Sequence, residues 1–297
     1  MVCGKGGCGK SSIVALMAQV LREEAYRVIV LDADASNPGG VARLIFGPTQ
    51  GPAPLLRFFG GRKMVECPVD NPAPLTRMHD PVPIREKNMD LAEIPSEYFL
   101  EKENILLFQV GKIEEFCEGC DGPMSKVARD FIVKGEYVQV IDIEAGIEHF
   151  GRGVEQNIDF ILVVVDPTFE SLLIAEKVSL ICSRMGKERI WTILNKVQSE
   201  EMESIMQDEL EKKKIQTLGV VRFDDELMLA GLMGLQIRKS MALEDMKKIM
   251  KKMMESVSEA RGRMRRLVFL ASCDRITLKR LTQSKRLQRE EDQPCIE

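Results

Sequence analysis

Near its start the chain reads Gly4-Lys5-Gly6-Gly7-Cys8-Gly9-Lys10-Ser11. The residues at positions 4, 9, 10 and 11 fit the pattern G-x-x-x-x-G-K-[ST] of a loop that wraps the phosphates of a nucleotide. Glycines suit such a loop because they have no Cβ atom to keep backbone N–H groups away from the anion. We expect Lys10 to neutralise the β and γ phosphates and the Ser11 hydroxyl to ligate Mg²⁺.

The residues after this phosphate loop (residues 4–11) have helical spacing. Apolar side chains that share one helical face stand at Ile13, Leu16, Met17, Val20 and Leu21. The N-terminus of such a helix carries partial positive charge and would face the bound anion. We therefore expect the residues from Gly4 to Ser12 to line a nucleotide site. A glycine-rich turn without a nucleotide is the alternative.

The composition is that of an ordinary globular protein. Its 297 residues are 44% hydrophobic and 30% charged, which is enough to bury a sizeable core. The formal net charge of -4 gives no overall basic field for nucleic acid. No apolar run reaches the roughly 18 residues of a membrane span, and no signal peptide precedes the loop. Eight cysteines indicate reduced thiols and metal ligands rather than disulfides, so we expect a cytoplasmic protein.

Strand and helix patterns alternate along the chain. Short apolar runs, typical of strands buried on both faces of a parallel sheet, occupy residues 27–31, 104–110, 137–141, 160–165, 191–194 and 218–223. The pattern predicts the α/β class, with a three-layer, doubly wound, mainly parallel sheet and helices on both faces. Only Met1, Val2 and Cys3 precede the loop. Either the first strand is a stub or, as we prefer, the native chain starts upstream.

Three regions are expected. A nucleotide-binding domain covers residues 1–255, and prolines recur within it over residues 48–95, which predicts an inserted surface lobe with little regular structure. Cys67 and His79 lie in this lobe, and neither has a partner at ligand spacing. Residues 256–297 are rich in arginine and lysine and predict a basic helix that fades into a disordered tail.

Carboxylates follow two of the buried strands. Asp34 comes after residues 27–31, at the edge where open α/β sheets bind ligands. It is a candidate to orient the water that attacks the γ phosphate, with a helix N-cap as the alternative. Asp142 follows the strand at 137–141 and is expected to hold Mg²⁺. The segment from Glu144 to His149 suits a switch that senses the γ phosphate, in which His149 serves as a hydrogen-bonding group or a catalytic base.

Two thiols stand at C-x-x-C spacing in the segment Cys117-Glu118-Gly119-Cys120. Such a pair supplies half of a tetrahedral site for one soft metal ion. In a two-fold dimer the same pair from each subunit would complete four thiolates. A redox dithiol and two structural cysteines are the alternatives.

The second lysine of the phosphate loop makes the chain resemble one class of ATPases. Lys5, in Lys-Gly-Gly-x-Gly-Lys-Ser, is similar to the deviant Walker A motif of the SIMIBI ATPases. The resemblance implies catalytic roles for Lys5, Lys10 and Asp34. It also implies a homodimer in which Lys5 reaches the nucleotide of the partner subunit. In this class the asparagine that corresponds to Asn195 contacts the adenine, and we expect Lys196 and Asp224 beside the base as well.

Within this class the chain is similar to the CooC-type nickel-insertion ATPases. The similarity lies in Gly111-Lys112-Ile113-Glu114-Glu115, in Cys120 with Pro123-Met124, and in the segment from Glu144 to Gly153. It implies ATP with Mg²⁺, a soft metal such as Ni²⁺ or Zn²⁺ at the dimer interface, and a client such as carbon monoxide dehydrogenase or acetyl-CoA synthase.

The cysteines depart from the pattern of that family. The family usually shows C-x-C, and here Cys120 fits the first position while Gly122 occupies the second and Cys117 stands upstream. One alternative is an ATP-driven reductase with a shared [4Fe–4S] cluster, similar to the nitrogenase iron protein. The other is a positioning ATPase similar to the MinD and ParA proteins, which binds a surface through the basic tail.

Overall fold

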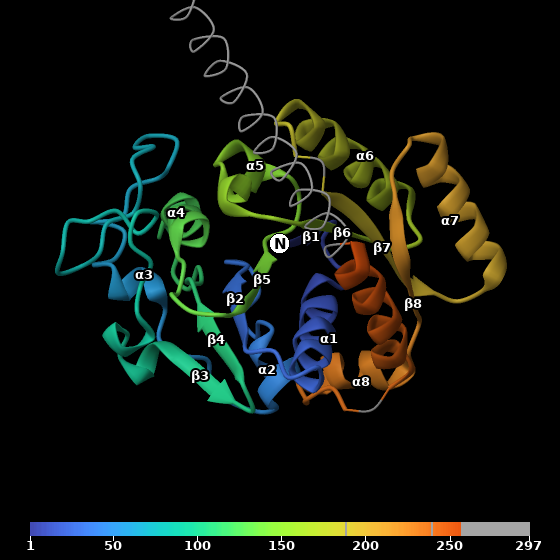
Figure 1. The fold of residues 1–297 in the computed structure, drawn as a ribbon, viewed down its shortest axis with the longest axis horizontal. Coiled ribbons are helices and arrows are strands. Elements are labelled where there is room, and N and C mark those ends of the chain that lie inside the picture. The colour runs from blue at the N-terminus through green and yellow to red at the C-terminus, as the bar shows by residue number, and fades with distance from the viewer. Residues whose placement is uncertain (188, 239, 257–297) are drawn as a thin grey trace, which may run out of the picture. The chain divides into compact units, whose positions relative to one another are not determined.

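One sheet runs through the centre of the molecule. The computed structural model describes residues 1–187, 189–238 and 240–256. The strands found there lie in the order β3-β4-β2-β5-β1-β6-β7-β8, and Figure 1 shows them side by side between two helical layers. Their bounds are β1 Val2–Gly4, β2 Val28–Ala33, β3 Phe99–Lys102, β4 Ile105–Gln109, β5 Val138–Ile143, β6 Ile161–Val165, β7 Ile190–Val197 and β8 Thr217–Arg222.

The strand pairing confirms the predicted mainly parallel sheet. The short strand β1 lies between β5 and β6, where Val2 pairs in register with Asp142 on one side and Leu162 on the other. All strand pairs are parallel except β3 with β4. Every residue of β6 is buried, as expected of a strand covered on both faces. The edge strand β3 was not predicted, because its residues are partly or fully exposed and form no apolar run.

Helices cover both faces of the sheet. Figure 1 shows α4, α5, α6 and α7 along one face and α1, α2 and α8 along the other. Their bounds are α1 Lys10–Glu23, α2 Ala42–Phe46, α3 Leu55–Phe58, α4 Gly122–Asp130, α5 Glu148–Gly151, α6 Phe169–Arg184, α7 Glu200–Lys212 and α8 Asp225–Met233. Three short 3-10 helices are also described: η1 Leu91–Glu93, η2 Ser96–Tyr98 and η3 Val154–Asn157. The helix α1 follows the phosphate loop as the sequence predicts.

The proline-rich segment at residues 48–95, called the lobe below, packs on the sheet with little regular structure. It contains α3 and η1 and is otherwise made of turns and loops. Apolar side chains nevertheless anchor it, because Val65, Leu75, Ile84 and Met89 are buried in the same core as the strands β2 and β4. Burial of such side chains stabilises irregular chain that makes few backbone hydrogen bonds of its own.

The chain divides into two compact units, Met1–Met250 and Lys251–Glu297. The methionine-rich stretch at residues 241–256 is helical. The predicted basic tail lies, from residue 257 onward, outside the described residues, so the domain boundary at residue 255 stays a prediction. In the described parts of the chain, every helix is too short or too polar to cross a bilayer.

Candidate functional site

A cavity of about 660 Å³ opens beside the phosphate loop. The parallel strands β1, β2, β5 and β7 all end at this edge of the sheet, which is where open α/β sheets bind ligands. Its lining combines the loop with the expected polar residues from other strand ends, among them Lys10, Ser11, Ser12, Asp34, Asn195, Lys196 and Asp224. The fold therefore brings distant parts of the predicted nucleotide site to one place.

Two glycines give the phosphate loop its shape. Gly4 has φ +143, and a Cβ atom there would lie 2.5 Å from the carbonyl oxygen of Val164 in the neighbouring strand. Gly9 has φ +98, and a Cβ atom would overlap the side-chain nitrogen of Asn195. Both conformations are costly for any residue with a side chain. The glycines at the ends of the motif are therefore required by backbone angle and by space.

Three side chains of the site donate hydrogen bonds to backbone carbonyl oxygens of the phosphate loop. Lys10 is 6% exposed, and its Nζ donates to the carbonyl oxygen of Lys5 at 3.3 Å. The side-chain nitrogen of Asn195 donates to the carbonyl oxygen of Cys8 at 2.8 Å. Lys196 Nζ donates to the carbonyl oxygen of Gly7 at 2.6 Å. The amide nitrogen of Asn195 is thus engaged with the loop, and its contact with adenine stays a prediction.

Asp224 has a clear structural task in addition to lining the cavity. Its carboxylate accepts hydrogen bonds from the backbone N–H of Leu227 at 3.0 Å and of Ala242 at 2.9 Å. The first bond caps the N-terminus of α8, and the second joins α8 to the start of the next helix. A role for Asp224 in binding the base stays a prediction.

Asp142 has the properties of a magnesium ligand. It is fully buried, and in the described part of the chain neither carboxylate oxygen has a hydrogen-bond partner. Burial raises the pKa of Asp142 to about 7, the nearby Asp32 adds to the rise, and the Ser11 hydroxyl and Lys10 oppose it. An unsatisfied buried carboxylate is costly. Mg²⁺ prefers oxygen ligands, so Ser11 and Asp142 fit the ion that the motif implies.

The neighbouring strand β2 contributes a buried ion pair that sequence reasoning missed. Asp32 pairs in register with Asp142 on β5, and its two oxygens accept hydrogen bonds from Lys112 Nζ at 2.9 Å each. Burial raises the pKa of the Asp32 carboxyl, and Lys112 works against that rise. Lys112 also donates to the carbonyl oxygen of Asp34 at 2.6 Å. It therefore ties the segment after β4 to the end of β2.

Asp34 points into the cavity edge on a short turn. One of its oxygens accepts from the backbone N–H of Ser36 at 2.9 Å and from the Ser36 hydroxyl at 2.6 Å. The alternative of a helix N-cap near Asn37 is not found, because the next helix, α2, begins at Ala42 without a side-chain cap. Asp34 lines the cavity, where the proposed orientation of water stays a prediction.

The signature lysine of the loop is tethered within its own subunit. Lys5 Nζ donates to the hydroxyl of Thr168 at 3.0 Å and lies 3.7 Å from a carboxylate oxygen of Asp166. The Thr168 hydroxyl in turn donates to the other oxygen of Asp166 at 2.7 Å. The Lys5 side chain is 29% exposed, so solvent has access to it.

The switch segment after β5 contacts the segment that bears the cysteines. Burial raises the pKa of Glu144 to about 7, and the nearby Asp121 carboxylate adds to the rise. Arg152 forms an ion pair with Asp121 from the other side. His149 is buried and neutral, because burial lowers its pKa to about 4. Among the described residues neither ring nitrogen of His149 has a hydrogen-bond partner, so the expected switch hydrogen bond is not formed.

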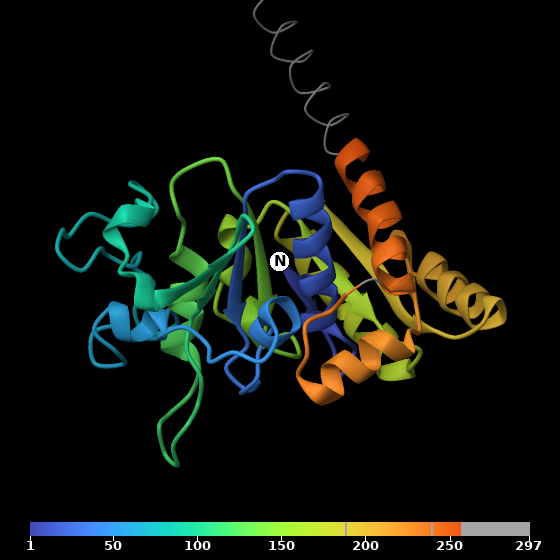
Figure 2. The same ribbon diagram turned by 90° about the horizontal axis from the view of Figure 1, so that it is seen from below.

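The predicted cysteine pair lies on the exposed segment at residues 111–121, called the thiol segment below. In Figure 2 it is the green loop at the bottom of the view, following β4. Cys117 and Cys120 are both exposed and free of disulfides, and Cys117 has φ +60. Across the part of the chain that the structure describes, no three cysteine, histidine or carboxylate side chains gather as a metal site. The pair thus supplies at most part of a ligand set.

The comparisons with known proteins agree with this geometry. Residues 1–237 match the family model described as the CobQ/CobB/MinD/ParA nucleotide binding domain. An uncharacterized ATP-binding protein of Methanocaldococcus jannaschii is 36% identical, over 84% of this chain and 98% of its own length. The carbon monoxide dehydrogenase accessory protein CooC of Rhodospirillum rubrum is 29% identical, over 79% of this chain and 87% of its own length.

The solved structures agree on the fold. The cell division protein MinD of Aquifex aeolicus superposes with a TM-score of 0.56 at 18% identity, covering 86% of this chain and 95% of its own. A ParA family ATPase of Chlorobium tepidum gives the same TM-score of 0.56 at 19% identity, covering 83% of this chain and 94% of its own. With its phosphate loop and its residues for Mg²⁺, the chain is an ATPase that belongs to the CobQ/CobB/MinD/ParA nucleotide-binding family.

Proposed function

We propose that the chain is a maturation ATPase that handles a soft metal ion. ATP and Mg²⁺ bind in the cavity and draw two subunits together, and thiols of the thiol segment, with Cys117 and Cys120, carry the ion. The ion is the cargo, nickel or one of similar chemistry, for a client such as carbon monoxide dehydrogenase or acetyl-CoA synthase. The observation that carries the proposal is a pair of contacts that join this segment to β2 and to the segment after β5: Asp32 with Lys112, and Arg152 with Asp121.

The residues of the cavity divide the work on ATP. Lys10 leaves the carbonyl oxygen of Lys5 and binds the β and γ phosphates, and the amides of the loop bind the remaining oxygens. Ser11, and Asp142 through water, would hold Mg²⁺, which would supply positive charge to the phosphates. Asp34 orients the attacking water from the cavity edge.

Two contacts would pass the state of the nucleotide to the thiols. The backbone N–H of Gly146 donates to the carbonyl oxygen of Gly4 at 3.1 Å, so the switch segment is bonded to the phosphate loop itself. Arg152, six residues later, forms an ion pair with Asp121, which directly precedes α4 and follows Cys120. A shift of the switch on binding or hydrolysis therefore moves the neighbour of a thiol.

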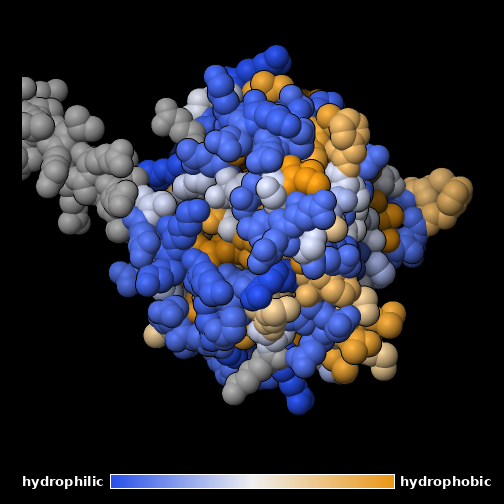
Figure 3. All heavy atoms as spheres, turned by 90° about the vertical axis from the view of Figure 1, so that its right-hand side faces the viewer, coloured by the Kyte–Doolittle hydropathy of each residue, from blue (hydrophilic) through white to orange (hydrophobic). Residues whose placement is uncertain are grey.

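A second copy of the chain is the expected partner at this edge. Exposed apolar side chains of α8 stand beside the cavity, and Figure 3 shows hydrophobic surface gathered at the lower right, where α8 lies. They are Met228, Leu229, Leu232 and Met233, each at least half exposed. Clusters of this kind favour protein contacts. Lys5 lies near the same cavity and would leave Asp166 to reach the partner's phosphates.

The dimer is tested by light scattering with a non-hydrolysable ATP analogue and Mg²⁺. Wild type should shift from monomer to dimer, and Lys10→Ala should lose nucleotide binding and the shift together. Lys5→Ala should keep nucleotide binding and lose the dimer. Equal dimerisation of Lys5→Ala and wild type would contradict the proposed arrangement.

The cargo is tested by metal analysis of protein purified without oxygen, with and without nucleotide. Nickel or zinc near one ion per dimer supports the proposal. About four irons per dimer with visible absorption would favour the iron–sulfur reductase instead. Absence of any metal, together with binding to liposomes or DNA, would favour the positioning ATPase.

A further inference from the structure

A third thiol lies beside the predicted cysteine pair, although the sequence separates it widely. A Cβ atom at Gly122 would lie 2.7 Å from the sulfur of Cys67 and 3.4 Å from the sulfur of Cys120. The two sulfurs are therefore about 6 Å apart at most. Cys67 comes from the lobe, whereas Cys120 and Gly122 lie at the start of α4.

The place of the Cys67 sulfur is informative because the neighbouring position 122 is a glycine and has no side chain. The C-x-C pattern of the resembled family would have its second thiol at position 122, where this chain has glycine. The sulfur of Cys67 occupies the space into which a side chain at position 122 would extend. A thiol supplied by the lobe thus stands in for the one that is missing from α4.

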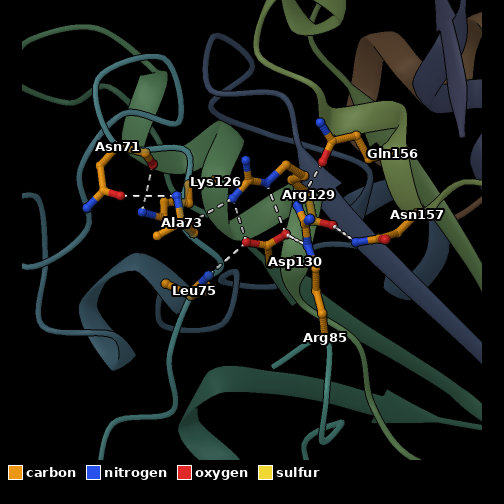
Figure 4. Close-up of polar contacts among 9 residues, drawn as sticks. All are labelled: Asn71, Ala73, Leu75, Arg85, Lys126, Arg129, Asp130, Gln156 and Asn157. Carbon is orange, nitrogen blue, oxygen red and sulfur yellow. Dashed lines mark hydrogen bonds and ion pairs between the residues drawn. The ribbon is translucent and has the colours of Figure 1, made fainter. Parts of the chain in front are cut away.

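Buried polar contacts hold the lobe against α4, as Figure 4 shows. The centre is Asp130, which is fully buried and accepts from the backbone N–H of Leu75 at 2.8 Å and from Arg85 Nε at 2.6 Å. Arg129 binds Asp130 at 2.8 Å and also donates to the carbonyl oxygen of Ala73 at 3.2 Å. Charge-assisted hydrogen bonds in a buried setting are strong, so these contacts hold the lobe, at Ala73, Leu75 and Arg85, against α4.

The same contacts continue toward Cys67 itself. Lys126 Nζ, one turn before Asp130 in α4, donates to the carbonyl oxygen of Asn71 at 3.1 Å. The backbone N–H of Asn71 in turn donates to the carbonyl oxygen of Cys67 at 2.9 Å. A chain of hydrogen bonds therefore runs from α4 to the backbone of the lobe thiol.

The lobe also fixes Cys120. Arg62 donates to the carbonyl oxygen of Cys120, and its Nε donates to Glu118 at 3.2 Å. The other oxygen of Glu118 accepts from the backbone N–H of Glu114 at 2.8 Å. Cys67 is thus held by contacts between the lobe and α4, and Cys120 by contacts between the lobe and the thiol segment, whereas Cys117 has no comparable support in the described contacts.

Metal ions bind the thiolate form of cysteine, and two features bring positive charge to this place. Cys120 lies just before the N-terminus of α4, where the helix dipole favours negative charge. The Lys126 ammonium donates to the carbonyl oxygen of Asn71, four residues after Cys67. Two thiolates make half of a tetrahedral site, and no third ligand gathers in the described residues. In the proposed dimer, the same pair from a second subunit would complete the set.

We propose that Cys67 and Cys120 are the metal-binding thiols of each subunit, with Cys67 taking the place of the thiol absent from position 122. Each thiol loses its proton as it binds, and four thiolates from two subunits hold one soft ion. The inference rests on the proposed function, because it names the ligands of the same metal site. It differs from the C-x-x-C pairing in giving Cys67, rather than Cys117, as the partner of Cys120.

The test is titration of the reduced full-length protein with Co²⁺, in the presence of Mg²⁺ and a non-hydrolysable ATP analogue. Co²⁺ reports thiolate ligands by a charge-transfer absorption band, and Zn²⁺ competition gives the affinity. Cys67→Ser and Cys120→Ser should lose the band and bind the metal at least about tenfold more weakly. Removing even a residue that only hydrogen-bonds to a metal ligand lowers metal affinity by about that factor. Cys117→Ser tests the competing C-x-x-C assignment and should bind within about threefold of wild type.

A rescue variant separates ligation from a structural role of Cys67. The double variant Cys67→Ala with Gly122→Cys places a thiol on α4 in the space that Cys67 leaves. It should regain the band and most of the affinity. Binding of a fluorescent ATP analogue, unchanged in every variant, shows that each one folds.

The outcomes distinguish the two proposals. If Cys67→Ser keeps the band while Cys117→Ser loses it, the C-x-x-C pair holds the metal and only this inference is overturned. If Cys67→Ser loses the band and the rescue variant does not regain it, Cys67 acts on structure and the inference is overturned as well. If the wild type binds no Co²⁺ or Zn²⁺ in any nucleotide state, the proposed metal function itself fails.

Discussion

Lys112 Nζ lies 2.9 Å from both carboxylate oxygens of Asp32, in an ion pair from which water is almost excluded. Asp32 belongs to β2, in register with Asp142, the expected magnesium ligand. Lys112 belongs to the thiol segment, eight residues before Cys120. The pair is thus a direct physical connection between the nucleotide edge of the sheet and the segment that we propose handles metal.

Lys112→Met is expected to destabilise the protein by about 3–5 kcal/mol, because it leaves the buried Asp32 carboxylate without its partner. Methionine keeps the length of the side chain, so the loss reports charge rather than packing. Urea unfolding at neutral pH measures it. The double variant Lys112→Met with Asp32→Asn should recover part of the loss, and a cost below about 1 kcal/mol for the single variant would contradict a buried pair.

Asp142→Asn should change how stability depends on pH. The pKa of Asp142 is raised to about 7 from an ordinary 3.8, so the stabilising contribution of its protonated form is full below the unfolded pKa. That contribution is lost as the pH rises through about 7. In the absence of Mg²⁺ and nucleotide, the variant should gain on wild type by roughly 3 kcal/mol from about pH 5 to about pH 8.

The measurement is thermal or urea unfolding of both proteins across that pH range. The same variant should lose the stabilisation that wild type gains from Mg²⁺ and ATP together, because the amide is a poor substitute for a carboxylate near the ion. A stability difference that does not vary with pH would show that Asp142 is ionised at little cost in the folded protein.

Gly9→Ala and Gly7→Ala should differ, although both glycines have positive φ. At Gly7, with φ +76, a Cβ atom meets nothing within 4 Å, so only backbone strain of about 1–2 kcal/mol is expected. At Gly9, with φ +98, the Cβ atom overlaps the Asn195 side chain and adds an overpacking cost of about 1–3 kcal/mol. Displacing Asn195 also breaks its bond to the Cys8 carbonyl.

Thermal unfolding and titration with a fluorescent ATP analogue compare these two variants. Gly7→Ala should remain folded and keep measurable affinity, whereas Gly9→Ala should lose nucleotide binding. Equal effects of the two substitutions would mean that the contact with Asn195 does not shape the loop.

The parts of the site that the sequence predicted are those encoded locally. The phosphate loop with Lys10 and Ser11 is a continuous motif, and Asp142 follows a buried run, so a reading along the chain finds both. The parallel sheet follows from apolar runs of strand length. Edge strand β3 lacks such a run, because half of its residues are exposed.

The parts of the site that the sequence did not predict depend on contacts between distant segments. A lysine in a loop is usually solvated, and nothing local indicates that Lys112 is buried against Asp32. Cys67 lies in irregular chain whose path is set by Asp130 and its arginine partners rather than by a repeating pattern. The one available signal was the glycine at position 122, which left a thiol missing while a further cysteine stood elsewhere in the chain.

Asp166→Asn should make dimerisation easier. Asp166 lies 3.7 Å from Lys5 Nζ, and in the proposed dimer it would compete with the partner's phosphates for that cation. Asparagine keeps an oxygen that accepts the Thr168 hydroxyl but removes the charge. The pair is partly exposed, so its loss is worth about 1 kcal/mol or less. The concentration of ATP analogue at half-dimerisation should therefore fall by up to about fivefold, as measured by light scattering.

Asp159→Asn, which removes an acidic side chain elsewhere on the surface, is the control and should leave this midpoint unchanged. A higher midpoint for Asp166→Asn would show that the carboxylate supports the dimer, and that Lys5 is positioned by Asp166 rather than restrained by it.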